Sequence, residues 1–427
     1  MNFTKRAGAA ALALSMVGIL AACAGGARAD AAPSIWTVGG GSEPMVRASL
    51  IDWNESNPDK YIEHEVIAND VFKERIRIAL GSDTPPTIFH NWSGGPLREY
   101  VENNQVVDIS AAAADLIDRV IPSVAANGII DGNVYAVPYV QAAPVMFFYN
   151  REVFDAAGVS PPTTFTELLE AVDALQDVGV IPISLAAGSR WPLLMWIQYL
   201  SDRIGGPEVF NAVLDGEEGA WSHPAMVEAL TRIQELVDRG AFGDAFGSVM
   251  ADQQADTALV ANGNAAMILQ GAWAFPNMLG SSPEFVESGY LGWFAFPEVE
   301  GGVGDVRNVV GNPSDFLSVS AASTPEEIEV AEAFIAQNVL NDDRIEDLLS
   351  IGAIPPIQGI RDRIVGRPHD DFMLWKYDLV LNAPHFQLSW DQALDGARAQ
   401  ALLDNLSQLF LSQITPQDFA TTMDALQ

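Results

Sequence analysis

Residues 132–158, which read GNVYAVPYVQAAPVMFFYNREVFDAAG, are the segment on which the predicted fold depends. The segment contains two short apolar runs, 134–137 and 145–149, and Pro138 and Pro144 bracket the residues between them. Each run is too short for a helix and is bounded by residues that break helices, so we expect two strands. Because proline cannot donate to a sheet ladder, we expect the chain between them to leave one sheet and enter another.

A helix is expected after the second strand, over 151–157, with Gly158 ending it. A strand, a crossing, a second strand and a helix in mid-chain indicate a hinge between two α/β lobes, and clefts between domains are where small ligands usually bind. An ordinary buried connection would show the same local pattern. The rest of the chain has to separate these two interpretations.

The chain on both sides alternates predicted strands and helices. Strands are predicted at 34–38, 62–67, 87–90, 181–185, 290–297 and 316–319. Thr164 with Glu167, and Thr324 with Glu327, have the spacing of capping boxes at helix starts. Two helices, 390–413 and 415–426, are predicted to form the tail. The alternation predicts a mostly parallel sheet that binds its ligand just beyond the strand carboxyl ends.

Two sequence patterns resemble those of extracellular solute-binding proteins. The first, G-x-x-Y-x-V-P, eight residues, then Y-N-x-x-x-F-x-x-x-G, resembles the hinge crossing of that group; it is carried by Gly132, Tyr135, Val137, Pro138, Tyr149, Asn150, Phe154 and Gly158. The second runs from Gly263 through Ala265-Ala266-Met267 to Gly271 and Trp273, and resembles the group's G-x-A-A-M…G-x-W strand and loop. The resemblance extends over about 35–426 and is to family 1, the maltose-binding-protein-like carbohydrate group of ATP-binding-cassette (ABC) importers.

This resemblance implies an α/β, two-lobed periplasmic-binding-protein-like fold with a ligand cleft at a multi-crossing hinge. We expect 31–141 plus 305–353 to form lobe 1, and 142–304 plus 354–427 to form lobe 2. The implied function is that of a monomeric extracytoplasmic substrate-binding component without a cofactor. It would capture a sugar, which we expect to be an oligosaccharide, and deliver it to membrane permease subunits.

Composition limits the alternatives. A chain of 427 residues, 49% hydrophobic and 18% charged, is long enough for two cored domains. A net charge of −34 argues against nucleic acid as a partner, because phosphates require a basic face. Five histidines and one cysteine leave little material for a metal cluster or a disulfide framework.

The segment 1–30 has the pattern of an export signal peptide. Lys5 and Arg6 precede an apolar run, 7–20, that is too short to span a bilayer. Leu20-Ala21-Ala22-Cys23 resembles a bacterial lipobox, so we favour cleavage before Cys23 and lipidation of that residue. Ala27-Arg28-Ala29 is an alternative cleavage site, which would release a soluble protein. The protein is therefore predicted in the periplasm or at the cell surface, anchored by lipid.

A sugar site needs flat aromatic side chains against which the sugar rings can pack. Amides and carboxylates are needed around them, so that each buried sugar hydroxyl has a hydrogen-bond partner. Trp92, Trp191 and Trp273 fall in loops just after predicted strands, where a ligand would lie, although packing in a core is the alternative for each.

The polar partners that we select are Glu43, Asn91, Gln141, Gln270, Asn312 and Asp391. Gln141 lies in the crossing itself, and Asn312 comes with Ser314 and Asp315 after the second crossing. Glu43 and Asp391 have an alternative role as helix caps.

Two other functions compete with sugar transport. An exported glycoside hydrolase would use two carboxylates, but the sequence shows no nucleophile elbow, H-E-x-x-H or similar signature, so we predict a protein that is not an enzyme. A polyamine-binding protein would use carboxylates and aromatic faces to hold ammonium groups. Binding without turnover would distinguish a sugar-binding protein from an enzyme, and a comparison of sugars with amines would distinguish it from a polyamine-binding protein.

Overall fold

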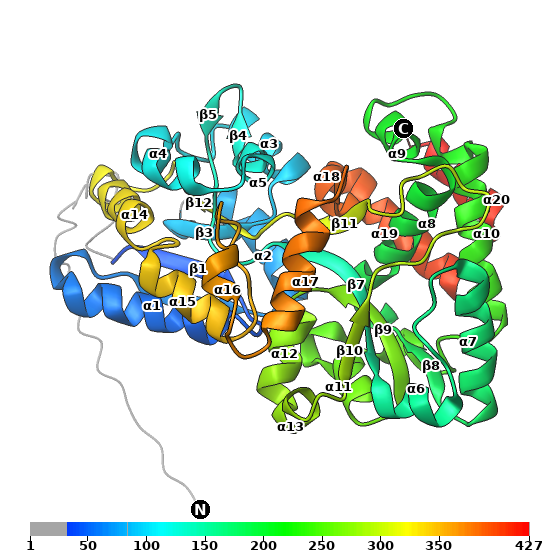
Figure 1. The fold of residues 1–427 in the computed structure, drawn as a ribbon. Helices are drawn as coiled ribbons and strands as arrows, with labels where there is room; N and C mark the ends of the chain where they lie inside the picture. The colour runs from blue at the N-terminus through cyan, green and yellow to red at the C-terminus, as the bar shows by residue number, and fades with distance from the viewer. Residues whose placement is uncertain (1–31, 83, 427) are drawn as a thin grey trace, which may run out of the picture. The chain divides into compact units, whose positions relative to one another are not determined.

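The computed structural model describes residues 32–82 and 84–426, and two main β-sheets with helices around them make up its fold (Figure 1). The predicted signal peptide, with Cys23 and Ala29, lies outside the described residues. Both sheets belong to one compact unit, Pro33–Gln427.

The first sheet has the strand order β2-β1-β3-β12-β6. Strands β1 (Ser34–Val38), β2 (Glu63–Ile67) and β3 (Ile88–Asn91) are parallel, and helices α1 (Glu43–Ser56), α2 (Asn69–Leu80) and α3 (Gly94–Glu102) follow them in turn. Strand β12 (Phe316–Val319) lies antiparallel between β3 and the short edge strand β6 (Val137–Pro138). The strands predicted at 34–38 and 316–319 are confirmed.

The second sheet is mixed, so the prediction of a mostly parallel sheet is wrong for this half of the fold. Its order is β13 (Phe386–Leu388), β11 (Val309–Asn312), β7 (Ala143–Asn150), β9 (Ala265–Gly271) and β8 (Ile181–Ser184), and β10 (Leu291–Phe294) also pairs with β7. Strand β7 runs antiparallel to β9, β10 and β11. Strand directions depend on the order of the strands in the sheet, and this order cannot be predicted from local hydrophobic periodicity.

The helices that cover the sheets begin largely where their caps predict. Besides α1, α2 and α3, the longer ones are α4 (Ser110–Arg119), α7 (Phe165–Asp177), α8 (Leu194–Gly205), α10 (Pro224–Asp238), α14 (Pro325–Gln337), α15 (Asp342–Ser350), α17 (Asp370–Leu381), α19 (Gly396–Phe410) and α20 (Pro416–Asp424). The capping boxes of Thr164 and Thr324 are both present. The single helix predicted over 390–413 is wrong. It is divided into α18 (Trp390–Ala393) and α19 because Asp395 accepts from the N–H groups of Ala397 and Arg398 and caps the second helix.

The two prolines of the 132–158 segment lie inside strands rather than outside them. Pro138 closes the edge strand β6, where a missing N–H leaves no partner unsatisfied, and Pro144 is the second residue of β7. The strand predicted over 134–137 is also wrong: Val134 belongs to β5 (Asn133–Val134), which forms a separate hairpin with β4 (Ile129–Ile130).

The chain passes from the first sheet to the second through 139–142, and it returns through 313–315. The N–H of Tyr139 donates to the carbonyl of Asp315 at 3.0 Å, which joins these two crossings. The N–H of Ala142 donates to the carbonyl of Ile354 at 3.2 Å, which brings a third segment beside them. Because β11 pairs in the second sheet, the return comes after Asn312 rather than after residue 304; the lobe assignment as a whole stays a prediction.

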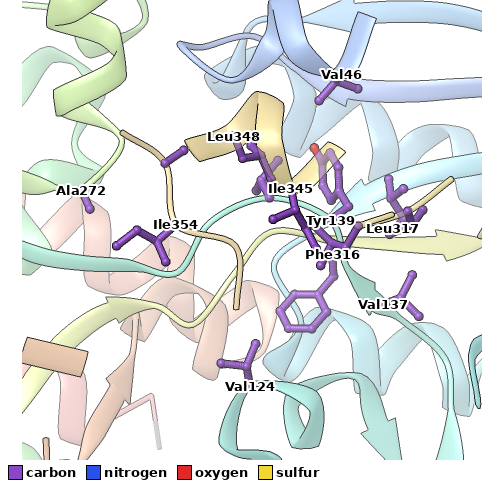
Figure 2. Close-up of a cluster of buried hydrophobic side chains, with 14 of the residues drawn as sticks. Val46, Val124, Val137, Tyr139, Ala272, Phe316, Leu317, Ile345, Leu348 and Ile354 are labelled. Atoms are coloured by element: carbon purple, nitrogen blue, oxygen red, sulfur yellow. The ribbon is translucent and has the colours of Figure 1, made fainter. Parts of the chain in front are cut away.

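A cluster of buried apolar side chains packs against the crossings. Tyr139, Phe316, Ile345 and Leu348 lie together there, with Ile354 on the neighbouring segment (Figure 2). A second cluster fills the space around α8 and α10, where Trp196, Trp221 and Trp390 are fully buried. The crossings are therefore supported by packed side chains, and the residues that they carry have little freedom to move.

Candidate functional site

A cavity of about 360 Å³ lies where the crossings meet the ends of strands from both sheets. Its walls include the glycine-rich loop after β1, the segments after β3, β8 and β9, and the end of β11. Cavities of roughly 300–1,000 Å³ at such positions are typical small-molecule sites. Its location agrees with the rule that α/β sheets bind ligands beyond their strand ends.

All but one of the predicted site residues line this cavity: Glu43, Trp92, Gln141, Trp191, Gln270, Trp273, Asn312 and Asp391. Asn91 does not. Its Nδ2 donates to Ser318 Oγ at 2.8 Å, and its Oδ1 accepts from the N–H of Ser93 at 2.9 Å. Successive residues of a strand point to opposite faces, so His90 and Trp92 reach the cavity while Asn91 faces the protein interior.

The three tryptophans are partly exposed and contribute separate aromatic surfaces. Trp273, at the start of α12 (Ala274–Ser281), makes an edge contact with Trp191 at 5.8 Å between ring centroids. Trp92 makes edge contacts with His90 at 4.2 Å and with Phe72 at 5.8 Å. The cavity is thus bordered by a tryptophan pair on the side of the second sheet and by Trp92 on the side of the first.

Protein partners already engage several of the predicted polar groups. The Gln270 amide donates to Asp256 at 2.9 Å and accepts from the N–H of Gly271. Asp391 pairs with Lys73 at 2.7 Å; Ser389 rather than Asp391 stands at the N-cap of α18. Glu43 opens α1 and pairs with Arg47. These contacts position the three side chains and leave fewer of their atoms for a ligand.

Gln141 is held by a buried lysine. Lys376 Nζ lies 2.8 Å from Gln141 Oε1 and 3.2 Å from the carbonyl of Gly352. Burial lowers the pKa of Lys376 to about 7. Lys376 Nζ donates to the carbonyl end of the Gln141 amide, which leaves the NH₂ end of that amide for the cavity.

Four buried polar atoms in the cavity wall have no hydrogen-bond partner in the described part of the chain. They are His90 Nε2, Trp191 Nε1, Gln254 Oε1 and Asn312 Oδ1. His90 is 1% exposed, and its Nδ1 lies 2.9 Å from the Tyr139 hydroxyl. Burial, assisted by the charge of Lys73, lowers the pKa of His90 to about 3, so the ring is neutral near pH 7. Unpartnered groups of this kind are expected where a ligand supplies the missing bonds.

Several residues of this wall were not predicted from the sequence. The period-two alternation of β3 would have selected His90 in place of Asn91. Tyr139 lies in the first crossing, two residues before Gln141, so the position in the crossing that selected Gln141 also applied to Tyr139. Lys73, Gln254 and Asp256 carry no such signal, because only the packing of distant helices and loops brings them to the cavity.

The cavity is acidic. Five carboxylate residues line it, Glu43, Asp252, Asp256, Asp315 and Asp391, and Lys73 is the only lysine or arginine among its described lining residues. Burial raises the pKa of Asp256 to about 6 and that of Asp315 to about 7. This arrangement disfavours an anionic ligand.

Polar contacts also join the two sides of the cavity. The N–H of Gly41 donates to Asn277 Oδ1, and the N–H of Asp70 donates to Asp252 Oδ2 at 2.9 Å. The second contact caps α2, whose own N-cap residue, Ala68, offers no side-chain acceptor.

Within residues 32–82 and 84–426, no group of three or more His, Cys, Asp and Glu side chains is arranged to hold a metal ion. Across the same residues, no helix has the length and apolar character needed to cross a membrane.

Comparison with known proteins identifies similar chains. Residues 40–336 match the family described as bacterial extracellular solute-binding proteins. An uncharacterised ABC transporter extracellular-binding protein of Pyrococcus horikoshii is 25% identical over 254 residues, which cover 56% of this chain and 54% of that protein. The chain thus spans about half the length of this relative. An arabinooligosaccharide-binding protein of Halalkalibacterium halodurans is 23% identical over 364 residues, or 79% of this chain and 74% of that one.

The fold is also shared with solved structures. A protein from work on xylan utilization by the thermophilic bacterium Caldanaerobius polysaccharolyticus superposes with a TM-score of 0.82 and 28% identity, and the match covers 93% of this chain and 100% of that one. This similarity supports the two-lobed periplasmic-binding-protein-like fold.

Proposed function

This chain belongs to the family of bacterial extracellular solute-binding proteins, and we propose that it captures a sugar for an ABC importer and that this sugar is an oligosaccharide. The observation that carries this proposal is the set of unpartnered polar atoms beside the tryptophans. Trp191 Nε1 can only donate, whereas Gln254 Oε1 and Asn312 Oδ1 can only accept. A sugar hydroxyl both donates and accepts, so one ligand can satisfy every one of these atoms.

The free-energy gain is appreciable. A buried polar group without a partner costs about 1–3 kcal/mol, which a ligand hydroxyl recovers on binding. The faces of Trp92, Trp191 and Trp273 supply apolar contact for the flat faces of the sugar rings. The proposed activity is binding without turnover, followed by delivery to membrane permease subunits. The ligand contacts both sides of the cavity and so favours their closed arrangement.

The proposal is tested by screening the signal-free protein for thermal stabilisation against arabino-, xylo-, chito- and malto-oligosaccharides. Binding to the native state alone raises stability by RT ln(1 + [L]/Kd), or about 2.7 kcal/mol at a hundredfold excess over Kd. We expect one class to raise the melting temperature in a concentration-dependent manner. The Asn312→Ala variant, which removes an unpartnered acceptor, should respond less to that class.

Two outcomes contradict the proposal. The first is stabilisation by spermidine with none by any sugar, which would favour polyamine transport. The second is cleavage of the stabilising oligosaccharide during prolonged incubation, detected by chromatography, which would favour an enzyme.

The family acts outside the cytoplasm, and we propose that Cys23 anchors this member by lipid, on the basis of the sequence 20–23. The variant Cys23→Ala should abolish labelling by a radioactive fatty acid and leave the precursor uncut or cut near Ala29. Membrane fractionation provides the second measurement. Unchanged membrane association of the variant would contradict the lipid anchor at Cys23.

A further inference from the structure

Asp315 is a half-buried carboxylate, and no residue in the described part of the chain forms a hydrogen bond or an ion pair with its side chain. It lines the cavity. Its main chain is well held, because its carbonyl accepts from the N–H of Tyr139 at 3.0 Å and from Ser314 Oγ at 3.1 Å. The other four carboxylates of the wall are bonded: Glu43 to Arg47, Asp391 to Lys73, Asp252 to the N–H of Asp70, and Asp256 to Gln270.

No ion pair within the described residues includes Asp315. Burial alone raises the pKa of its carboxyl group, with no contribution from a neighbouring lysine or arginine. His90 lies on the same wall, but it is neutral near pH 7 because burial depresses its pKa to about 3. A half-buried carboxylate without a counter-ion costs free energy in its charged form, and such groups are found mainly at functional sites.

A second group, independent of the carboxylates, points to a ligand at this place. His90 is 1% exposed, lines the cavity and leaves Nε2 without a partner in the described chain, while its Nδ1 is engaged by the Tyr139 hydroxyl at 2.9 Å. The N–H of Tyr139 is in turn bonded to the carbonyl of Asp315. His90 is linked to the side chain of Tyr139, and Asp315 is linked to its main chain. We refer to these three residues of the cavity wall, which come from β3 and the two crossings, as one corner of the cavity.

The charge of the whole cavity favours the same class of ligand. Lys73 pairs with Asp391 and Arg47 pairs with Glu43, whereas no ion pair within the described residues includes Asp252, Asp256 or Asp315. A cleft lined by one sign of charge concentrates ligands of the opposite sign. The aromatic faces of Trp92 and Tyr139, which also line the cavity, attract cations as well as sugar rings.

We propose that this corner recognises a basic amine on the ligand, so that the sugar which the cleft takes is an amino sugar whose ammonium group pairs with Asp315. The inference rests on the proposed sugar-binding function and specifies its ligand class. A neutral hydroxyl can donate to Asp315 but brings no charge, whereas an ammonium brings both donors and the missing positive charge. Pairing also lowers the pKa of Asp315 by charge attraction, so the carboxylate is ionised in the complex.

The test compares three monosaccharides that differ only at carbon 2: glucosamine with an ammonium, glucose with a hydroxyl and N-acetylglucosamine with an acetamide. Calorimetry and thermal shift are measured at about pH 6.5, where the amine is protonated because amines of this kind titrate at roughly 8. We expect glucosamine to bind at least tenfold more tightly than the other two. The wild-type comparison needs no variant, so it does not depend on the folding of any substitution.

The isosteric variant Asp315→Asn should bind glucosamine and glucose equally. The matched control is Asp252→Asn, which removes the same charge from the same cavity at a carboxylate that already has a partner, and it should keep the preference. Equal binding of the three sugars to the wild type, no binding of any of them, or a preference that survives in Asp315→Asn would overturn the inference. Stabilisation by a neutral oligosaccharide together with no preference for the amine would overturn this inference and leave the proposed function standing.

Discussion

Replacing Arg203 by methionine is expected to lower the free energy of unfolding by about 3–5 kcal/mol, because it leaves a buried carboxylate without its partner. Arg203 is 2% exposed and Asp202 3% exposed, and Nη1 of the first lies 2.7 Å from Oδ1 of the second. Burial already raises the pKa of Asp202, which shows that its charged form is difficult to accommodate. Denaturant titration at about pH 7 measures the loss.

The position of this pair links stability to the cavity. Arg203 Nη2 donates to the carbonyl of Asn308 at 3.0 Å, and the Asn308 amide donates to Asp202 at 3.0 Å. Asn308 immediately precedes β11, which carries Asn312 into the cavity wall. The pair therefore fastens the start of that strand to α8.

Two further variants control this experiment. Arg239→Met breaks exposed pairs with Asp173, at 2.9 Å, and with Glu235, at 3.4 Å, and should cost less than about 1 kcal/mol because water screens both. The double variant Arg203→Met/Asp202→Leu removes both charges and should recover part of the loss. A loss for Arg203→Met as small as that for Arg239→Met would contradict the prediction.

Truncation of Trp273 is expected to weaken sugar binding by about thirtyfold, or on the order of 2 kcal/mol, the loss typical of a central interface tryptophan. Trp273 is partly exposed at the cavity wall, and its ring lies so close over Gly271 that a Cβ added there would approach it to 2.2 Å. The glycine thus leaves room for the ring to lie against the end of β9. A partly exposed tryptophan should contribute less to stability than the roughly 3–5 kcal/mol of a core residue.

The matched control is Trp293→Ala. Trp293 is also partly exposed, but it lies outside the cavity wall and packs against Phe372 with 5.1 Å between ring centroids. It should lower stability and leave affinity unchanged, as measured by denaturant titration and by calorimetry with the oligosaccharide found in the screen. A Trp273→Ala protein with markedly reduced stability and unchanged affinity would place Trp273 in the core and contradict its stacking role.

Features that depend on neighbours within a few positions could be predicted from the amino-acid sequence alone. The capping boxes of Thr164 and Thr324 connect residues three apart, and both are present as predicted. The same holds for β1 and β12, and for the tryptophans that follow β3 and β9, because strand ends and turns are encoded locally. Local patterns were therefore sufficient to indicate which segments face the cavity.

Tertiary packing, in contrast, determines which side chains share the cavity and which are already engaged. Lys73 and Asp391 lie 318 positions apart, and Lys376 and Gln141 lie 235 positions apart; no local period relates the members of either pair. The tolerance of Pro138 and Pro144 inside strands likewise depends on which neighbours pair with them. Local patterns record the hydrogen bonds and faces of one segment, whereas the surroundings of these side chains depend on how distant segments pack, and that packing is a property of the whole chain.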